Sequence, residues 1–242
     1  MRVAVVSDIH ANLHALDAVL AELDRDPPDQ IWSLGDVVGY GPRPNECCRL
    51  VRDRAVVGLV GNHDLVVLGD VDVAEFNPDA GRAAAWTREE IDDASRAYLR
   101  ALAPAGAAAG VELYHASPRD PVWEYVLDDR AVEASFALTR APLVLIGHSH
   151  VPIAARLADR GVDAAHARAG TEVEVASGRL LLNPGSVGQP RDGDPRAAYL
   201  LLDLDAGRAS FHRVAYAVER TQAEIRERRL PDALAERLAY GV

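Results

Sequence analysis

The chain has 242 residues, of which 49% are hydrophobic and 26% charged, and its formal net charge is −11. This composition is typical of a globular protein with a sizeable core, and the negative charge argues against long-range attraction to duplex nucleic acid. No apolar run is long enough to cross a bilayer, and the first ten residues, MRVAVVSDIH, do not form a signal peptide. We therefore expect a cytoplasmic protein that does not contact a membrane. The adjacent Cys47 and Cys48 cannot easily bridge each other, so no disulfide framework is expected.

The first quarter of the chain alternates between strand and helix patterns. A short Val-rich run at 2–8 predicts a buried strand, and leucines then recur at helical spacing over 13–23. A second strand is expected at 31–36, a helix at about 44–53, and a third strand with an exit loop at 55–64. This β-α-β-α-β order is typical of a layered α/β fold.

The middle of the chain is less regular. Residues 69–82 are polar and poorly periodic, which indicates a surface loop, and whether this loop forms a lid beside a site is left open. Thr87 and Glu90 match a capping box that would open a helix running towards Leu102. After PAGAAAG, read as a spacer, strands are expected at VELYHAS and PLVLIG, with a helix over 128–138 between them.

The sequence pattern changes in the C-terminal part of the chain. From 151 to 216 short alternating segments indicate antiparallel strands and a second sheet, and the last 25 residues indicate helices. We find no internal repeat and no linker composition. A single domain over residues 1–242 is therefore expected.

Histidines gather where apolar strands end. Five of the eight histidines directly follow such a run, and they are His10, His63, His115, His148 and His150. Four other polar residues occupy the same kind of position, and they are Asp8, Asp36, Asn62 and Asp64. Ligands and catalytic groups in α/β folds collect at the carboxyl ends of strands. In LVLIGHSH (143–150) the glycine would let the chain turn tightly, so that both imidazoles aim at one place.

This residue set has the composition of a metal site. Imidazole, carboxylate and amide ligands together suit Mn, Fe, Co, Ni or Zn better than Mg. Seven such groups are too many for one tetrahedral ion, but they fit two divalent ions that share a bridging carboxylate. Pairs of ions of this kind are a known solution for phosphate-ester hydrolysis, and they would make the pocket electropositive inside an acidic protein.

Five short blocks carry a family resemblance. SDIH (7–10), GDVVGYG (35–41), GNHD (61–64), YHAS (114–117) and GHSH (147–150) resemble, in order, the motifs of the calcineurin-like metallophosphoesterases. The segment LLNPGSVGQPRDGDP (181–195) also resembles the small bacterial members, near the YfcE-like phosphodiesterases and the compact diadenosine-tetraphosphatase-like group. The resemblance implies an α/β fold, namely a four-layer αββα sandwich of two mixed sheets flanked by helices.

The resemblance also implies a role for each matching residue. One metal would be held by Asp8, His10, Asp36 and His150. The other metal would share Asp36 as a bridge and would be held by Asn62, His115 and His148. His63 would face the substrate as general acid or phosphate-stabilising donor, with Asp64 holding its orientation, and a metal-activated water would attack phosphorus.

Several residues have a simpler interpretation beside the functional one. Arg191, in GQPRDG, is a candidate substrate contact, with a merely solvated arginine as an equal alternative, and Arg119 is a weaker candidate. His14 lies four residues after His10, but no glutamate follows His10, so we interpret His14 as a solvent-facing residue of a first helical turn. His166 and His212 have no such context and are taken as structural or exposed.

The sequence therefore predicts a metal-dependent phosphoesterase acting on a small phosphorylated substrate. A phosphomonoester, a phosphodiester and a dinucleoside polyphosphate all fit, and the oligomeric state, including a homo-oligomer, is left open. The alternative is a non-catalytic protein-interaction scaffold on the same fold. That alternative needs a damaged site, whereas His63 and all seven ligand positions are present in this chain.

Overall fold

Two mixed sheets form the centre of the molecule. The computed structural model describes residues 1–159 and 161–242, and in these residues it contains two six-stranded sheets. The first sheet has the order β3 (Val57–Gly58), β2 (Gln30–Ser33), β1 (Arg2–Val6), β11 (Ala197–Asp203), β12 (Arg208–Val214) and β9 (Glu172–Glu174). The second has the order β4 (Ala105–Ala108), β5 (Val111–Tyr114), β6 (Leu143–Leu145), β10 (Arg179–Asn183), β7 (Ile153–Ala158) and β8 (Gly161–His166). In each sheet a parallel part meets an antiparallel part, at the β1–β11 pair and the β10–β7 pair.

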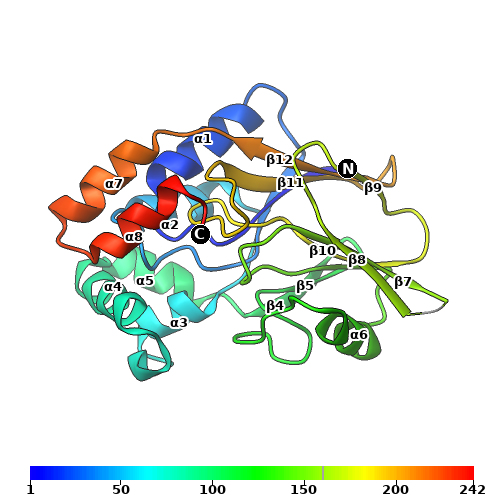
Figure 1. Ribbon diagram of the computed structural model, residues 1–242, viewed down its shortest axis with the longest axis horizontal. Coiled ribbons are helices and arrows are strands. Elements are labelled where there is room, and N and C mark those ends of the chain that lie inside the picture. The colour runs from blue at the N-terminus through cyan, green and yellow to red at the C-terminus, as the bar shows by residue number, and fades with distance from the viewer. Residues whose placement is uncertain (160) are drawn as a thin grey trace.

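Helices cover the outer faces of both sheets (Figure 1). The helices are α1 (Leu13–Leu23), α2 (Pro44–Arg54), α3 (Asn62–Leu68), α4 (Pro78–Glu90), α5 (Asp93–Arg100), α6 (Asp129–Leu138), α7 (Val218–Glu227) and α8 (Asp232–Glu236), with short 3₁₀ helices at Val73–Glu75 and Arg237–Ala239. Helices α1 and α2 share one apolar core with the first sheet, and α6 shares another with the second sheet. The four-layer αββα sandwich predicted from the sequence is confirmed.

Strand β1 shows how the sequence builds these layers. Its side chains alternate between the two faces of the sheet. Val3 and Val5 join the core between the sheets, whereas Ala4 and Val6 join the core under the helices. Because both faces are covered, the strand reads as a continuous apolar run, and its end is fixed close to the buried centre of the molecule.

Two of the predicted loops contain helices. The strand expected at 55–64 is reduced to the two residues of β3, and the GNHD motif opens α3 instead of lying in an extended loop. The segment 69–82 holds the 3₁₀ helix Val73–Glu75 and the start of α4, so its interpretation as a surface loop is wrong after Asn77. Asn77 caps this helix and Pro78 occupies its first turn, a combination that favours a helix start.

The capping box predicted at Thr87 is also wrong. Thr87 lies inside α4, where its hydroxyl donates to the Ala83 carbonyl at 2.8 Å, and the next helix is capped by Asp92. The spacer PAGAAAG contains strand β4, because pairing with β5 gives its small residues a place in the sheet.

The C-terminal third contributes to both sheets. Its short strands pair antiparallel with one another as predicted, although β10 also pairs parallel with β6. They do not form a separate sheet, because β11 and β12 extend the first sheet beside β1, while β7 and β8 extend the second. The expected C-terminal helices are present, and α7 packs against α1. Within the described residues, none of the helices has the length and apolar character that crossing a bilayer requires.

Candidate active site and metal centre

The predicted ligands come together at one edge of the sandwich. Asp8 and His10 follow β1, Asp36 follows β2, and Asn62 opens α3. His115 follows β5, while His148 and His150 follow β6. The pairs β1–β2 and β5–β6 are both parallel, so their carboxyl ends meet at the same edge. All seven side chains are buried.

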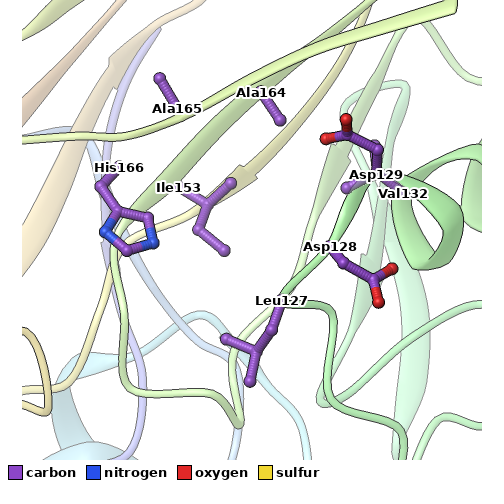
Figure 2. A pocket seen from close by; sticks show the side chains of 8 residues that line it. All are labelled: Leu127, Asp128, Asp129, Val132, Ile153, Ala164, Ala165 and His166. Atoms are coloured by element: carbon purple, nitrogen blue, oxygen red, sulfur yellow. The ribbon is translucent and has the colours of Figure 1, made fainter.

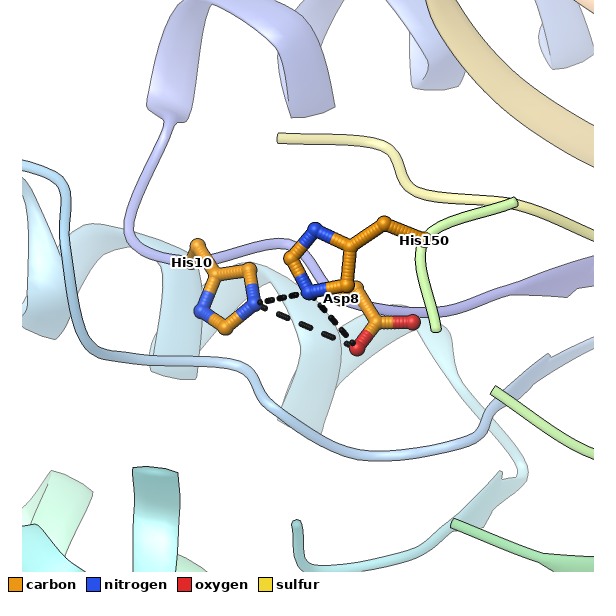
Figure 3. A group of neighbouring side chains, drawn as sticks. All are labelled: Asp8, His10 and His150. Atoms are coloured by element: carbon orange, nitrogen blue, oxygen red, sulfur yellow. Dashed lines mark hydrogen bonds and ion pairs between the residues drawn. The ribbon is translucent and has the colours of Figure 1, made fainter. Parts of the chain in front are cut away.

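The structure contains three groups of potential ligands, and within each group the ligand atoms lie within 4.8 Å of one another. The groups are Asp8–His10–His150, Asp36–His115–His148 and His10–Asp36–His63. Figure 3 shows the first group, in which Asp8 Oδ1 is 3.5 Å from His150 Nε2 and 3.9 Å from His10 Nε2. The first two groups correspond to the two ligand sets implied by the resemblance, and Asn62 Oδ1 lies 3.2 Å from His115 Nε2 beside the second.

Asp36 lies between the first two groups. Its Oδ1 accepts the main-chain N–H of His63 at 2.9 Å. Its Oδ2 is 3.6 Å from His10 Nε2 and 3.6 Å from His115 Nε2, which belong to different groups. One carboxylate oxygen thus faces both groups.

Main-chain carbonyls fix the direction of the four histidine rings. The pairs are His10 Nδ1 with Val38 O (3.2 Å), His115 Nδ1 with Leu34 O (2.8 Å), His150 Nδ1 with Gln189 O (2.6 Å) and His148 Nε2 with Trp123 O (3.1 Å). A ring nitrogen beside a carbonyl must carry the proton and donate it. The opposite nitrogen of each neutral ring is then a free lone pair, which is the form in which histidine binds metals.

The site has the donor set that a cation needs. The lone pairs of His10 Nε2 and His150 Nε2 face each other at 3.0 Å, and burial lowers the pKa of both rings, so neither carries a second proton. Asp8 Oδ1 and Asp36 Oδ2 are buried without a hydrogen-bond partner among the described residues. Burial raises the pKa of Asp8 to about 7. Converging lone pairs and unpaired carboxylate oxygens are unfavourable without a cation, so these residues fit divalent metal ions.

The backbone at the site is strained. Five of the seven predicted ligands have a left-handed φ between 50° and 63°, and they are Asp8, His10, Asp36, His148 and His150. Residues other than glycine adopt this conformation only at a cost, and such residues cluster at functional sites.

Gly147 has a different role from the predicted one. The left-handed turn is made by His148 and His150 themselves, and Gly147 is not among the residues with positive φ. A Cβ at position 147 would overlap the Ser7 hydroxyl and approach Asp8 Oδ2 to 3.1 Å. The glycine therefore lets the loop after β6 approach the loop after β1, so that the His148 N–H donates to Asp8 Oδ2 at 3.1 Å.

His63 lies beside the first group within an aromatic cluster. Its ring centroid is 4.8 Å from that of His10, 4.3 Å from Tyr40 and 4.3 Å from Phe76, on which it stacks. The ring is buried, its Nδ1 has no hydrogen-bond partner among the described residues, and burial lowers its pKa. Gly39 leaves room for the ring, because a Cβ there would press against it.

The expected contact between Asp64 and His63 is not formed. The Asp64 carboxylate accepts main-chain N–H groups from Gly61 (3.0 Å), Val37 (3.3 Å) and Val38 (3.0 Å). Asp64 is the third residue of α3, so its side chain points back over the helix start and towards the loop after β2. It therefore joins two segments that carry predicted ligands, instead of orienting the imidazole ring.

The remaining candidates have diverse surroundings. Arg191 borders the cluster, since its Nη2 is 3.3 Å from the Tyr40 hydroxyl. Arg119 pairs with Glu124. His14 lies in the first turn of α1 as expected, but its side chain is only partly exposed, and its Nε2 contacts Glu224 on α7 at 3.2 Å. His166 is exposed, and the half-buried His212 stacks on Tyr199.

Aromatic residues at the site were not found by the sequence analysis. Tyr40 and Phe76 surround His63, while Tyr125 stacks on His148 at 4.1 Å and is 49% exposed. The only signal for them was aromatic residues in otherwise polar segments. A separate surface pocket lies between the start of α6 and strands β7 and β8 (Figure 2), and no predicted site residue lines it.

Fold and site together define a class of protein. A buried set of imidazoles and carboxylates at the strand ends of an αββα sandwich is the arrangement of a metal-dependent phosphoesterase. A model of the calcineurin-like phosphoesterase superfamily domain matches residues 1–207. The chain belongs to this superfamily and is a metal-dependent phosphoesterase, so the resemblance seen in the sequence is confirmed.

Individual relatives extend this result. A metallophosphoesterase from Sphaerobacter thermophilus has 44% sequence identity to this chain. Its crystal structure matches the fold with a TM-score of 0.91 and covers 100% of this chain and 99% of that one. An uncharacterized protein of Methanocaldococcus jannaschii is 36% identical over 245 residues, or 99% of this chain and 98% of its own length. A symmetrical bis(5′-nucleosyl)-tetraphosphatase of Yersinia enterocolitica is 41% identical over 112 residues, which is only 38% of each chain.

Proposed function

We propose that the protein hydrolyses small phosphate esters with two divalent metal ions. Asp8, His10 and His150 would hold one ion, Asn62, His115 and His148 the other, and Asp36 would bridge them. The observation that carries this proposal is the position of Asp36 Oδ2, a buried oxygen without a hydrogen-bond partner among the described residues that lies 3.6 Å from a histidine nitrogen of each group. The mixed nitrogen and oxygen ligands favour Mn, Fe, Co, Ni or Zn.

The residues of the chain would divide the chemistry among them. When bound, the two ions supply Lewis acidity towards the phosphoryl oxygens and lower the pKa of the water that attacks phosphorus. His63 lies against the first group and would donate a proton or a hydrogen bond to the leaving oxygen. The negative charge of a bound phosphate ester favours the protonated ring and would offset the lowering of the His63 pKa by burial. Arg191 would contact the negative charge of the substrate. Asp64 would hold the loop after β2 against the start of α3.

The substrate would be small, because the proposed ligands are buried within the sandwich edge. Phosphomonoesters, phosphodiesters and dinucleoside polyphosphates are compatible with the site, and the partial match to a bis(5′-nucleosyl)-tetraphosphatase supports the last class. The exposed ring of Tyr125 beside His148 offers a flat apolar surface to a planar leaving group. No observation favours the non-catalytic scaffold, since every proposed ligand is present.

A metal-dependence assay tests the proposal. Protein dialysed against chelator should be inactive on p-nitrophenyl phosphate and bis(p-nitrophenyl) phosphate, and added Mn, Co, Ni or Zn should restore turnover better than Mg. Metal analysis should find two ions per chain, and at most one in Asp36→Asn. Full turnover in excess chelator, or two retained ions in Asp36→Asn, would contradict the two-metal assignment.

We also propose that residues 1–242 form one domain, because the C-terminal strands complete both sheets and α7 packs on α1. A cytoplasmic location and a homo-oligomeric state stay predictions from the sequence. Light scattering of the purified protein would measure the oligomeric state directly.

A further inference from the structure

Two arginines from distant parts of the chain converge beside the proposed metal centre. Arg191 lies in the loop after β10, and Arg237 begins the last 3₁₀ helix. Arg191 Nη2 donates to Gln189 Oε1 at 3.0 Å, and Arg237 Nη1 donates to the same oxygen at 3.4 Å. One neutral amide oxygen thus holds two positive charges close together.

Neither guanidinium is neutralised by a side chain. The protein has 37 acidic residues, yet in the described part of the chain neither Arg191 nor Arg237 forms an ion pair with an aspartate or a glutamate. Arg191 lies over the Tyr40 ring, at 5.8 Å from its centroid. Arg237 donates its Nε–H at 2.6 Å to the main-chain oxygen of Val242, the last residue of the sequence, where a free carboxylate would offset one of the two positive charges. Arg191 Nε is buried and has no hydrogen-bond partner among the described residues.

The arginine pair has an excess of positive charge even with one terminal carboxylate beside Arg237. Two like charges that share one acceptor repel each other, and a buried N–H without an acceptor is unfavourable. Partial burial and the charge of Arg191 lower the pKa of Arg237. An anion bound between the two guanidiniums would offset the repulsion and accept their free N–H groups.

The arginine pair is connected directly to the proposed ligands. The main-chain oxygen of Gln189 accepts from His150 Nδ1 at 2.6 Å, while its side chain holds both arginines. The Tyr40 ring, which contacts Arg191, is 4.7 Å from the ring of His10. Gln189 therefore contacts both the arginine pair and the proposed metal ligand His150.

We propose that Arg191 and Arg237 bind a second phosphoryl group of the substrate, next to the group that is cleaved at the metal centre. Planar guanidinium groups match phosphate oxygens in bidentate geometry, and two of them suit a group with more than one negative charge. The inference rests on the proposed function and narrows it to esters with at least two linked phosphoryl groups, such as a dinucleoside polyphosphate. A substrate with one phosphorus atom would place no second phosphoryl group at Arg237.

The experiment compares inhibitors with one and three phosphorus atoms. Turnover of p-nitrophenyl phosphate by the metal-loaded protein is measured with inorganic phosphate or inorganic triphosphate as inhibitor, at constant free metal. Triphosphate should inhibit the unmodified protein at least about 10-fold more strongly than phosphate. Arg237→Gln should lose most of this preference, because hydrogen bonds to charged groups typically change affinity by about 10- to 100-fold.

Two further variants control for the fold. Arg237→Lys keeps the charge and should retain part of the preference. Arg226→Gln removes an exposed arginine of α7 that pairs with Asp232, and it should change neither inhibition constant. Uninhibited kcat/KM on p-nitrophenyl phosphate should stay within about twofold in Arg226→Gln, and thermal unfolding checks that the C-terminal helices remain folded in all three variants.

The outcomes separate this inference from the proposed function. An unchanged ratio of the two inhibition constants in folded Arg237→Gln would overturn the second phosphoryl site, and so would equal inhibition of the unmodified protein by both anions. If no p-nitrophenyl ester is hydrolysed with any metal, the proposed function fails instead. The arginine pair is then tested by the thermal stabilisation that triphosphate gives, which Arg237→Gln should reduce and Arg226→Gln should not.

Discussion

Each proposed ligand depends on a neighbouring main-chain group for its direction. His150 illustrates this, since its Nδ1 is held by Gln189 O at 2.6 Å and its Nε2 is directed to Asp8 and His10. A ring fixed in this way loses little freedom when it binds a metal, and the carbonyl also selects the tautomer with a free lone pair. Replacing a ligand therefore removes both a donor atom and a prearranged geometry.

His63 allows ligation and acid catalysis to be separated. His63→Ala should keep two metal ions per chain and lose kcat by about 10²- to 10⁴-fold on alkyl or nucleoside esters, because a poor leaving group needs a proton. The loss should be smaller on p-nitrophenyl esters, whose leaving group hardly needs one. Steady-state kinetics on both substrate types and metal analysis measure these effects.

The exposed His166 provides the control, and His166→Ala should leave kinetics and metal content unchanged. Equal losses on good and poor leaving groups would reduce the role of His63 to charge stabilisation. Loss of a metal ion would make it a ligand, as its place in the group with His10 and Asp36 permits.

At the scale of elements, the site depends on how closely the strand-exit loops approach one another. Strand β1 belongs to one sheet and β6 to the other, yet the loops that follow them meet where His148 donates its N–H to Asp8. Gly147 makes this approach possible because it has no Cβ. The inter-sheet core sets the distance between the sheets, and this glycine sets the distance between the loops.

Gly147→Ala should therefore damage both stability and function. A methyl group there must displace Ser7, which we expect to cost about 1–3 kcal/mol in the free energy of unfolding, and the shift should weaken metal binding through Asp8. Urea unfolding and metal titration measure the two effects.

Gly81→Ala is the matched control. Gly81 lies inside α4, and a Cβ there would meet Val73 at an ordinary distance of 3.5 Å. Alanine also favours the helix, so this variant should be at least as stable as the unmodified protein. If Gly147→Ala were equally harmless, the close approach would not constrain the site.

At the scale of the whole molecule, the C-terminal helices hold the N-terminal elements. Asn12 caps α1, accepts a hydrogen bond from the Thr221 hydroxyl at 2.9 Å and donates to the Gly188 carbonyl at 2.8 Å. Glu224 on α7 accepts two hydrogen bonds from Arg43, each of 2.8 Å. These contacts join segments about 200 residues apart, so the first and last parts of the chain should unfold together.

The Glu224–Arg43 pair gives this connection a pH dependence. The hydrogen bond that Arg43 donates lowers the pKa of the Glu224 carboxyl below its usual value of 4.5. The stabilisation is therefore present above about pH 4.5 and is lost as the pH falls through the lower pKa of the folded protein. Glu224→Gln should reduce the free energy of unfolding by about 1 kcal/mol at pH 7, and this difference should disappear in strong acid.

Urea unfolding of both proteins across this pH range measures the effect. Glu236→Gln changes an exposed residue of α8 without an ion pair among the described residues, and it should be neutral at every pH. A stability difference for Glu224→Gln that did not change with pH would contradict the assignment.

Local signals determined much of this protein. Short continuous apolar runs predicted β1 and β2, and leucines of period 3.6 predicted α1, because these elements bury continuous faces. The helix expected over 128–138 is present as α6. The five motif blocks predicted the family, and the polar residues in them lie at one edge as expected, since parallel strands end together. Local sequence patterns did not predict the start of α4, because Asn77 and Pro78 are also typical of loops. They did not predict β4 either, because its small residues form a strand only by pairing with β5.

Only the tertiary structure decided which groups meet across the chain. Nothing near Arg237 in the sequence points to Arg191, because their shared contact with Gln189 depends on α7 and α8 folding back over the loop that carries this residue. The same holds for Asp64, whose carboxylate bonds to the loop after β2 and not to its sequence neighbour His63. The sequence by itself determined which chemical groups the site contains, since that follows from short motifs at strand ends. Their partners and directions were decided by packing, because each depends on backbone groups that only the folded sheets and helices bring within hydrogen-bonding distance.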